Sequence, residues 1–82
     1  MILNYRSGVD IRTGDRVLFH SKPGEIEFVA TDPEDPETAW YVQEYGGGVM
    51  ILEPRVFGRV FIQASQLQST EDLEFVARGQ EQ

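Results

Sequence analysis

Residues 40 to 53 constrain the fold more than any other stretch, because two short apolar runs meet there at three consecutive glycines. In each run, apolar or aromatic side chains alternate with their neighbours. Alternation on both sides of a glycine-rich turn is typical of a β-hairpin. We therefore expect residues 40 to 45 and 49 to 53 to form paired antiparallel strands, joined by a hairpin turn at Gly46, Gly47 and Gly48.

The register of this hairpin follows from its hydrophobic pattern. A three-residue loop sets Tyr45 opposite Val49 on one face of the sheet, whereas a loop of two glycines would mix Glu44 and Glu53 into the apolar set. We favour the three-residue loop for this reason. The face expected to point into the core then carries Trp40, Val42, Met50 and Leu52.

The rest of the chain also consists of short runs rich in Val, Ile, Phe and Tyr, broken by Gly, Pro and Asp. Such runs predict strands and tight turns. We expect an all-β domain over residues 1 to 78: a small, strongly curved antiparallel sheet or partly open barrel of about five strands, with at most a short 3₁₀ turn. The other expected strands cover residues 2 to 5 or 9 to 11, 16 to 20, 25 to 31, 56 to 63 and 73 to 78, with turns at 12 to 15 and 21 to 24. We expect a polar connection at 64 to 69, a single helical or 3₁₀ turn at 70 to 72 and a flexible tail at 79 to 82.

Within the strand at 25 to 31, Ile26, Phe28 and Ala30 share one face, and we expect that face to point into the core. Glu25, Glu27 and Val29 share the other face, so solvent-facing alternation explains the two glutamates better than a catalytic carboxylate pair does.

Charge and composition exclude several classes of function. The chain has 82 residues with 7 basic and 14 acidic side chains, a net charge of −7, and no cysteine. The absence of cysteine excludes disulfides and thiolate zinc sites. The negative charge repels nucleic-acid phosphates and anionic lipids and favours basic partners. Because no apolar run is long enough for a signal peptide or a membrane span, we expect a cytoplasmic protein that binds neither nucleic acid nor membrane.

The segment Gly14-Asp15-Arg16-Val17, followed by Pro23-Gly24-Glu25-Ile26 and the expected hairpin, resembles the SH3-like barrels, including domains with the KOW motif. The resemblance implies a small barrel, and KOW domains commonly bind RNA or protein. Here the seven cations are scattered among twice as many acids, which argues against RNA.

Gly14-Asp15-Arg16-Val17 and Gly48-Val49-Met50-Ile51-Leu52 are also similar in placement to segments of the type II dihydrofolate reductases, SH3-like proteins that assemble as tetramers around a central pore. That family's pore carries a Val-Gln-Ile-Tyr run, whereas this chain has Met50 in place of the glutamine and Leu52 in place of the tyrosine. The similarity therefore implies a shared fold and transfers no catalytic residue.

No other motif points to catalysis, a metal or a cofactor. His20 is the single histidine, and no nucleophile elbow, phosphate loop or zinc-protease element accompanies it. The acidic loop at Asp32, Glu34, Asp35 and Glu37 lacks the glycine and the distal glutamate of an EF-hand, so we interpret it as a solvated loop that could attract a basic protein. We expect no catalytic residue, no metal site and no cofactor.

The second face of the expected sheet carries the strongest functional signal. Exposed apolar patches of this kind mark interfaces, unless the N-terminal residues Ile2, Leu3 and Tyr5 or the closing strand cover them. We predict a non-catalytic interaction domain that self-associates as a homo-oligomer or docks a basic protein partner, as an immunity protein or antitoxin would. The alternative is a small-molecule binder or enzyme whose site forms between subunits. The predicted partner-binding residues are Tyr41, Tyr45, Val49, Ile51, Phe57 and Phe61.

Overall fold

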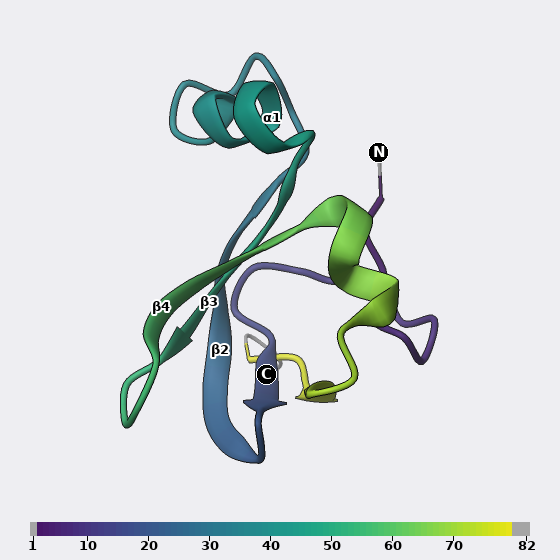
Figure 1. Cartoon of the computed structure of the whole chain (residues 1–82), viewed down its shortest axis with the longest axis vertical. Helices are drawn as coiled ribbons and strands as arrows, with labels where there is room; N and C mark the ends of the chain where they lie inside the picture. Colours follow the sequence, from purple (N-terminus) through teal and green to yellow (C-terminus); the bar gives the residue numbers. More distant parts are fainter. Residues whose placement is uncertain (1, 80–82) are drawn as a thin grey trace.

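A computed structural model describes residues 2 to 79. The elements are β1 (Arg16–Phe19), β2 (Lys22–Ala30), α1 (Ala39–Tyr45), β3 (Gly48–Glu53), β4 (Gly58–Gln63), the 3₁₀ helix η1 (Ala64–Ser69) and β5 (Leu73–Ala77). The strands form one antiparallel sheet in the order β4-β3-β2-β1-β5, which curves without closing (Figure 1). The predicted all-β class with a five-stranded antiparallel sheet is confirmed.

The short helix α1 replaces the first arm of the expected glycine hairpin, so that prediction is wrong. Gly46 adopts a left-handed conformation with φ of 75° and donates its N–H to the Val42 carbonyl at 2.9 Å. Gly47 donates its N–H to the Tyr41 carbonyl at 3.3 Å. The left-handed Gly46 and its bond to Val42 make an αL motif, which ends a helix. The glycines therefore stop α1 and start β3; at Gly48 a Cβ atom would collide with the Ile62 carbonyl of β4.

Because residues 40 to 45 do not pair with β3, the two faces of β3 are the reverse of those expected. Val49 and Ile51 are 0% exposed and point into the core. Met50 pairs with Phe61 of β4 and with Phe28 of β2 on the opposite face. A bulge between Ile26 and Phe28 moves Phe28 to that face as well, away from its expected place in the core.

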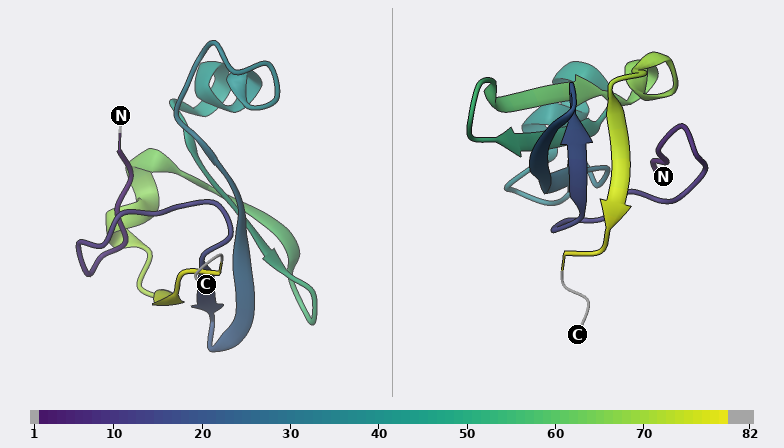
Figure 2. Two further views of the ribbon diagram at one scale, coloured as in Figure 1. Left: turned by 180° about the vertical axis from the view of Figure 1, so that it is seen from behind. Right: turned by 90° about the horizontal axis from the view of Figure 1, so that it is seen from below.

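The inner face of the sheet is covered by the N-terminal segment and by η1, which lie on the same side of it (Figures 1 and 2). For Val49 and Ile51, the alternative that the chain's own N-terminus covers this face is therefore what the structure shows. The buried cluster consists of Leu3, Tyr5, Ile11, Val17, Phe19, Ile26, Val49, Ile51, Ile62, Leu67 and Leu73.

Several boundaries differ from the expected ones. The N-terminal segment forms one isolated bridge, between Asn4 and Asp10, rather than a strand. The 3₁₀ helix covers the expected polar connection at 64 to 69 instead of residues 70 to 72. Of the expected tail, Gly79 lies against Gly14, and residues 80 to 82 are outside the described residues.

The turn between β1 and β2 is tighter than expected and includes only His20 and Ser21, with φ of 51° and 67°. Two positive φ values between paired strands define a type I′ turn. Pro23 therefore lies inside β2, opposite Leu18. Its missing N–H is tolerated because the pairing of β2 with β3 begins only at Glu25.

A buried carboxylate joins the N-terminal segment to the end of β5. Asp15 is 1% exposed and accepts hydrogen bonds from the Tyr5 hydroxyl at 2.7 Å, from Arg78 Nη1 at 2.8 Å and from the Arg12 N–H at 2.9 Å. Burial, and then the bond to Asp15, raises the pKa of Tyr5 above its ordinary 10.0, so its hydroxyl stays a donor. Arg78 also binds the Asp10 carboxylate at 3.0 Å.

Asp15→Asn should lower the free energy of unfolding by about 3 kcal/mol, because Arg78 loses its buried charge partner. Asp32→Asn is the matched control. Its side-chain oxygen still accepts the Glu34 N–H, so the change should stay within about 0.5 kcal/mol. Urea unfolding followed by circular dichroism measures both changes. Equal losses for the two variants would contradict a stabilising role for the hydrogen bonds of Asp15.

A second buried carboxylate organises the turn between β3 and β4. Glu53 is 0% exposed, and its carboxylate accepts the N–H groups of Arg55, Val56 and Phe57, each at 2.8 Å. Burial disfavours the charged form, but the three backbone donors outweigh it and hold the pKa of Glu53 below its ordinary 4.5. The ionised carboxylate thus accepts hydrogen bonds from backbone N–H groups of the turn that no strand can bind.

A group whose pKa is lower in the folded state stabilises the fold at pH values above its pKa in the unfolded state. This stabilisation is lost as the pH falls through the pKa of the folded state. The wild type should therefore lose stability as the pH drops below 4.5, and Glu53→Gln should show a shallower loss. Denaturant unfolding between neutral and acid pH measures both slopes. Glu44→Gln, at an exposed position, should keep the wild-type slope, and a Glu53→Gln slope equal to the wild type's would count against this account.

Candidate functional site

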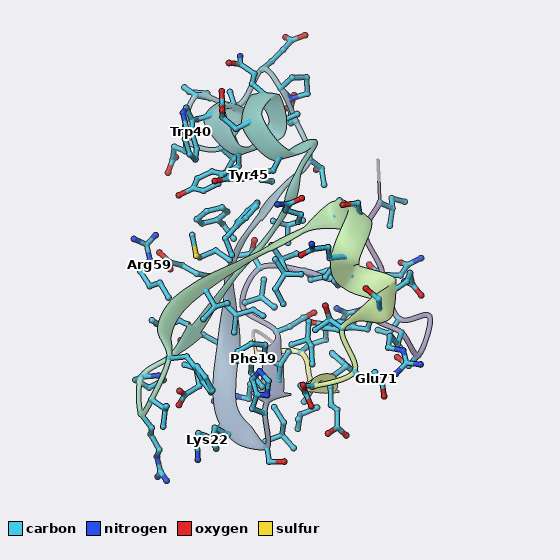
Figure 3. The ribbon with its side chains drawn as sticks, in the orientation of Figure 1. Phe19, Lys22, Trp40, Tyr45, Arg59 and Glu71 are labelled. Atoms are coloured by element: carbon cyan, nitrogen blue, oxygen red, sulfur yellow. The ribbon has the colours of Figure 1, made fainter. Side chains whose placement is uncertain are left out.

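Five aromatic rings from three elements meet on the outer face of the sheet. This aromatic cluster consists of Phe28, Trp40, Tyr41, Tyr45 and Phe61. Its centre is the pair Tyr41 and Phe61, stacked with ring centroids 4.7 Å apart. Figure 3 shows Trp40 beside α1 and Tyr45 below it, toward the sheet.

The sheet positions one half of the cluster and α1 the other. Phe28, Met50 and Phe61 are paired across β2, β3 and β4, which makes an apolar row on the outer face. Tyr41 and Tyr45 are four residues apart and so lie on the same side of α1. Both contact Phe61, with Tyr45 at 5.2 Å. The helix is held in place by these contacts, since its seven residues are too few to form a stable helix alone.

Two rings of the cluster remain largely in solvent. Trp40 is 56% exposed and Tyr45 is 40% exposed, while Tyr41 and Phe61 are half-buried beneath them. Trp40 contacts Tyr41 at 5.0 Å and Tyr45 at 5.7 Å, both edge to face. The outer surface of α1 thus presents a tryptophan and a tyrosine that are already oriented by their neighbours.

The predicted partner-binding residues divide into three groups. Tyr41, Tyr45 and Phe61 come together in the cluster, although on a helix and a strand rather than on a hairpin. The prediction is wrong for Val49 and Ile51, because both are fully buried in the core. Phe57 is 41% exposed but lies elsewhere, against Phe19 at 5.2 Å and His20 at 4.9 Å.

Trp40, the most exposed ring of the cluster, was assigned to the core by its position in the expected hairpin. A helical signal is present in the sequence: Tyr41 and Tyr45 have a spacing of four, and Gly46 follows directly. That signal competes with the strong β preference of Trp, Tyr and Val, and the alternating pattern covers only six residues.

The acidic loop leads directly into α1. Asp32 accepts the Glu34 N–H at 2.9 Å and Asp35 accepts the Glu37 N–H at 3.0 Å, so these two aspartates shape the loop. Glu34 and Glu37 are exposed, as is Glu44 on α1. From Pro23 to Pro54 the sequence has eight acids and no base, namely Glu25, Glu27, Asp32, Glu34, Asp35, Glu37, Glu44 and Glu53.

Strand β4, which carries Phe61, also carries one cation, and this cation is already paired. Arg59 of β4 makes two hydrogen bonds to the Glu27 carboxylate, at 2.8 and 3.0 Å, and these bonds raise the pKa of Arg59. Glu37 precedes Trp40 by three residues and Glu44 follows it by four on α1, so these carboxylates bring negative charge close to Trp40.

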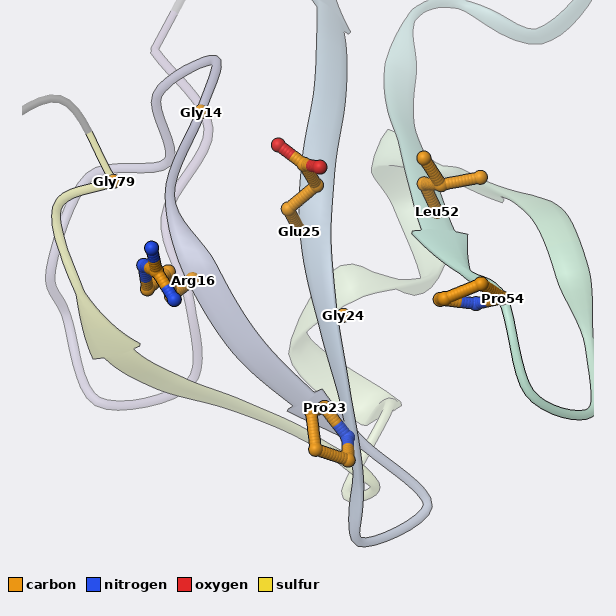
Figure 4. A pocket seen from close by; sticks show the side chains of 8 residues that line it. All are labelled: Gly14, Arg16, Pro23, Gly24, Glu25, Leu52, Pro54 and Gly79. Carbon is orange, nitrogen blue, oxygen red and sulfur yellow. The ribbon is translucent and has the colours of Figure 1, made fainter.

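A cavity of about 290 Å³ opens at the other end of the sheet, where Arg16 of β1 lies opposite Glu25 of β2 (Figure 4). Its remaining walls are glycine, proline and Leu52, so it presents one charge of each sign. Within residues 2 to 79, no three His, Asp or Glu side chains gather in a group that could hold a metal ion. Over the same residues, no helix is both long and apolar enough to cross a membrane.

Comparisons with protein-family models, with curated proteins and with solved structures found no match for this chain. The resemblances to SH3-like barrels and to type II dihydrofolate reductases therefore stay predictions.

The cluster predicts a clear division between rings that hold the fold and rings that do not. Phe61→Ala should lower the free energy of unfolding by about 2 kcal/mol, because Phe61 anchors both tyrosines of α1 to the sheet. Trp40→Ala should cost less than about 1 kcal/mol, because the indole is mostly in solvent. Urea unfolding measures both, and a larger loss for Trp40→Ala would make that ring a structural residue.

Proposed function

We propose that this protein is a non-catalytic interaction domain of the SH3-like type, which docks a basic protein partner through the outer surface of α1. The docking surface consists of Trp40, Tyr45, Glu34, Glu37 and Glu44. The observation that carries the proposal is the exposure of Trp40, 56%, beside Tyr45 on a helix that directly follows the acidic loop. Small size and a net charge of −7 suit a domain that neutralises a basic effector, as an immunity protein or antitoxin would.

Aromatic side chains suit the centre of such an interface. Trp and Tyr bury a large area with few rotatable bonds and are enriched among the residues that dominate binding energy. Their ring faces also attract the cations of Lys and Arg. Because Trp40 and Tyr45 are already held by Tyr41 and Phe61, little conformational freedom is lost when a partner covers them.

Charge favours a basic partner over a second copy of this chain. In a two-fold dimer, the same surface meets itself, so Glu37 and Glu44 would face the same carboxylates of the partner copy. Like charges placed opposite each other oppose binding. A basic protein avoids this repulsion, and the net charge of −7 speeds its encounter.

The proposal is tested by affinity capture with the immobilised protein. The captured protein is identified, purified and titrated against this domain. The partner should be basic, and its affinity should fall as salt rises. The double change Trp40→Ala and Tyr45→Ala should weaken binding by more than about tenfold, since central aromatic anchors dominate an interface. Glu37→Gln with Glu44→Gln should weaken binding and reduce its salt dependence.

Glu25→Gln with Asp72→Asn is the matched control, because it removes the same amount of charge away from α1 and should leave binding within about twofold of the wild type. Asp32 and Asp35 are left unchanged because they shape the loop. Unaltered binding by the Trp40 and Tyr45 double variant would overturn the proposal. Light scattering that shows a wild-type dimer split by Tyr45→Glu would assign the surface to self-association instead.

A further inference from the structure

Strand β5 ends the sheet and leaves one edge open. On its other side it pairs with β1, with Leu18 opposite Glu74 and Phe19 opposite Leu73. In the same register, the His20 N–H donates to the Asp72 carbonyl at 2.9 Å. Backbone groups of alternate residues in an antiparallel strand point to opposite sides. Those of Glu74 therefore point to β1, and those of Leu73 and Phe75 point to the open edge.

No hydrogen bond joins this edge to another segment of the chain between residues 2 and 79. The right-hand view of Figure 2 shows β5, in yellow, as the outer strand, with the N-terminal segment, in purple, beyond it. The backbone N–H and C=O groups of Leu73 and Phe75 are thus available to a further strand, and unpaired edges of this kind are ready templates for pairing.

A groove runs along the open edge. Its volume is about 540 Å³, within the range of ligand sites in proteins. One wall is β5 together with Glu71, and the other wall is the N-terminal segment. Because this second wall closes the far side, the groove suits a single extended chain rather than the sheet of a second copy. The lining residues are Tyr5, Arg6, Ser7, Val9, Glu71, Leu73, Glu74 and Phe75.

The usable edge is short. Val17 pairs with Phe75 but Arg16 pairs with Ala77, so Val76 is an extra residue that forms a bulge. Regular pairing can therefore extend only over residues 73 to 75. An edge of this length selects a peptide segment of a few residues and discourages the long edge-to-edge contacts that lead to aggregation.

The charges of the groove favour a basic segment. Arg6 is the one cation among the lining residues, and it lies 3.9 Å from Glu71. Glu74 is exposed and makes no ion pair or hydrogen bond through its side chain within the described residues. The half-buried ring of Phe75 supplies apolar surface to the groove, whereas the Leu73 side chain is buried in the core.

We infer that the open edge of β5 binds an extended peptide segment, in which apolar residues alternate with Lys or Arg, as a sixth strand of the sheet. Main-chain hydrogen bonds to Leu73 and Phe75 hold the segment, and Glu74 attracts its basic side chain. This site lies at the opposite end of the molecule from α1 (Figure 1), and it does not depend on the docking surface there.

Selection of short peptides from a random phage-displayed library against the full-length protein tests the inference. Selected peptides should lack proline and alternate apolar with basic residues. On binding, the amide protons of Leu73 and Phe75 should exchange more slowly with solvent, while the Trp40 indole signal stays unchanged. Glu74→Lys should weaken binding by roughly tenfold, and the matched charge reversal Glu44→Lys should leave it unchanged.

N-methylated peptides separate strand addition from other modes of binding. Methylation of two peptide nitrogens that face β5 removes two main-chain hydrogen bonds and should weaken binding by about tenfold. Methylation of the two intervening nitrogens, which face away, should have little effect. Failure to enrich any peptide, equal tolerance of both methylation patterns, or loss of binding on Trp40→Ala would overturn the inference. The last outcome would place the peptides on the docking surface, so the two proposals fail separately.

Discussion

Strand β3 carries apolar side chains on both of its faces, and the rest of the structure covers them. Val49 and Ile51 are fully buried on the inner face, beneath Leu3, Tyr5 and the other residues of the core. Met50 is buried on the outer face, between Phe28 and Phe61. A sheet of five short strands cannot hide both faces by itself. The N-terminal segment and η1 cover the inner face, and the seven residues of α1 cover the outer face only in part.

The incomplete cover on the outer face links the fold to the proposed function. A longer helix would bury the whole apolar row, but α1 ends at Gly46 after two turns. Its own exposed surface then adds Trp40 and Tyr45 to the apolar area in solvent. The acidic loop, which must reach from the end of β2 to α1, brings carboxylates to the same place. One packing solution therefore accounts for both the aromatic and the acidic character of the surface.

Two buried carboxylates secure the ends of this arrangement in different ways. Asp15 binds side chains from distant parts of the sequence, Tyr5 and Arg78, and so fixes the N-terminal segment over the core. Glu53 accepts hydrogen bonds only from the backbone of Arg55, Val56 and Phe57 and fixes a turn. Both carboxylates are satisfied by hydrogen bonds within the fold, so their burial has a structural explanation. We propose function instead for two surfaces of the molecule, at α1 and at the open edge of β5.

The sequence by itself determined the all-β class, the number of strands and the strong negative charge, because these depend on composition and on local alternation. It predicted Tyr41, Tyr45 and Phe61 as surface aromatic residues for the same reason. The conformation of residues 39 to 45 was decided only by the tertiary structure. Trp, Tyr and Val favour a strand locally, but as a helix this segment sets Tyr41 and Tyr45 together on Phe61. The bulge after Ile26 could not be predicted from the local sequence either, because it depends on how β2 pairs with β3. Packing between distant residues outweighed local preference at both places, and this moved Val49 and Ile51 into the core and left Trp40 in solvent.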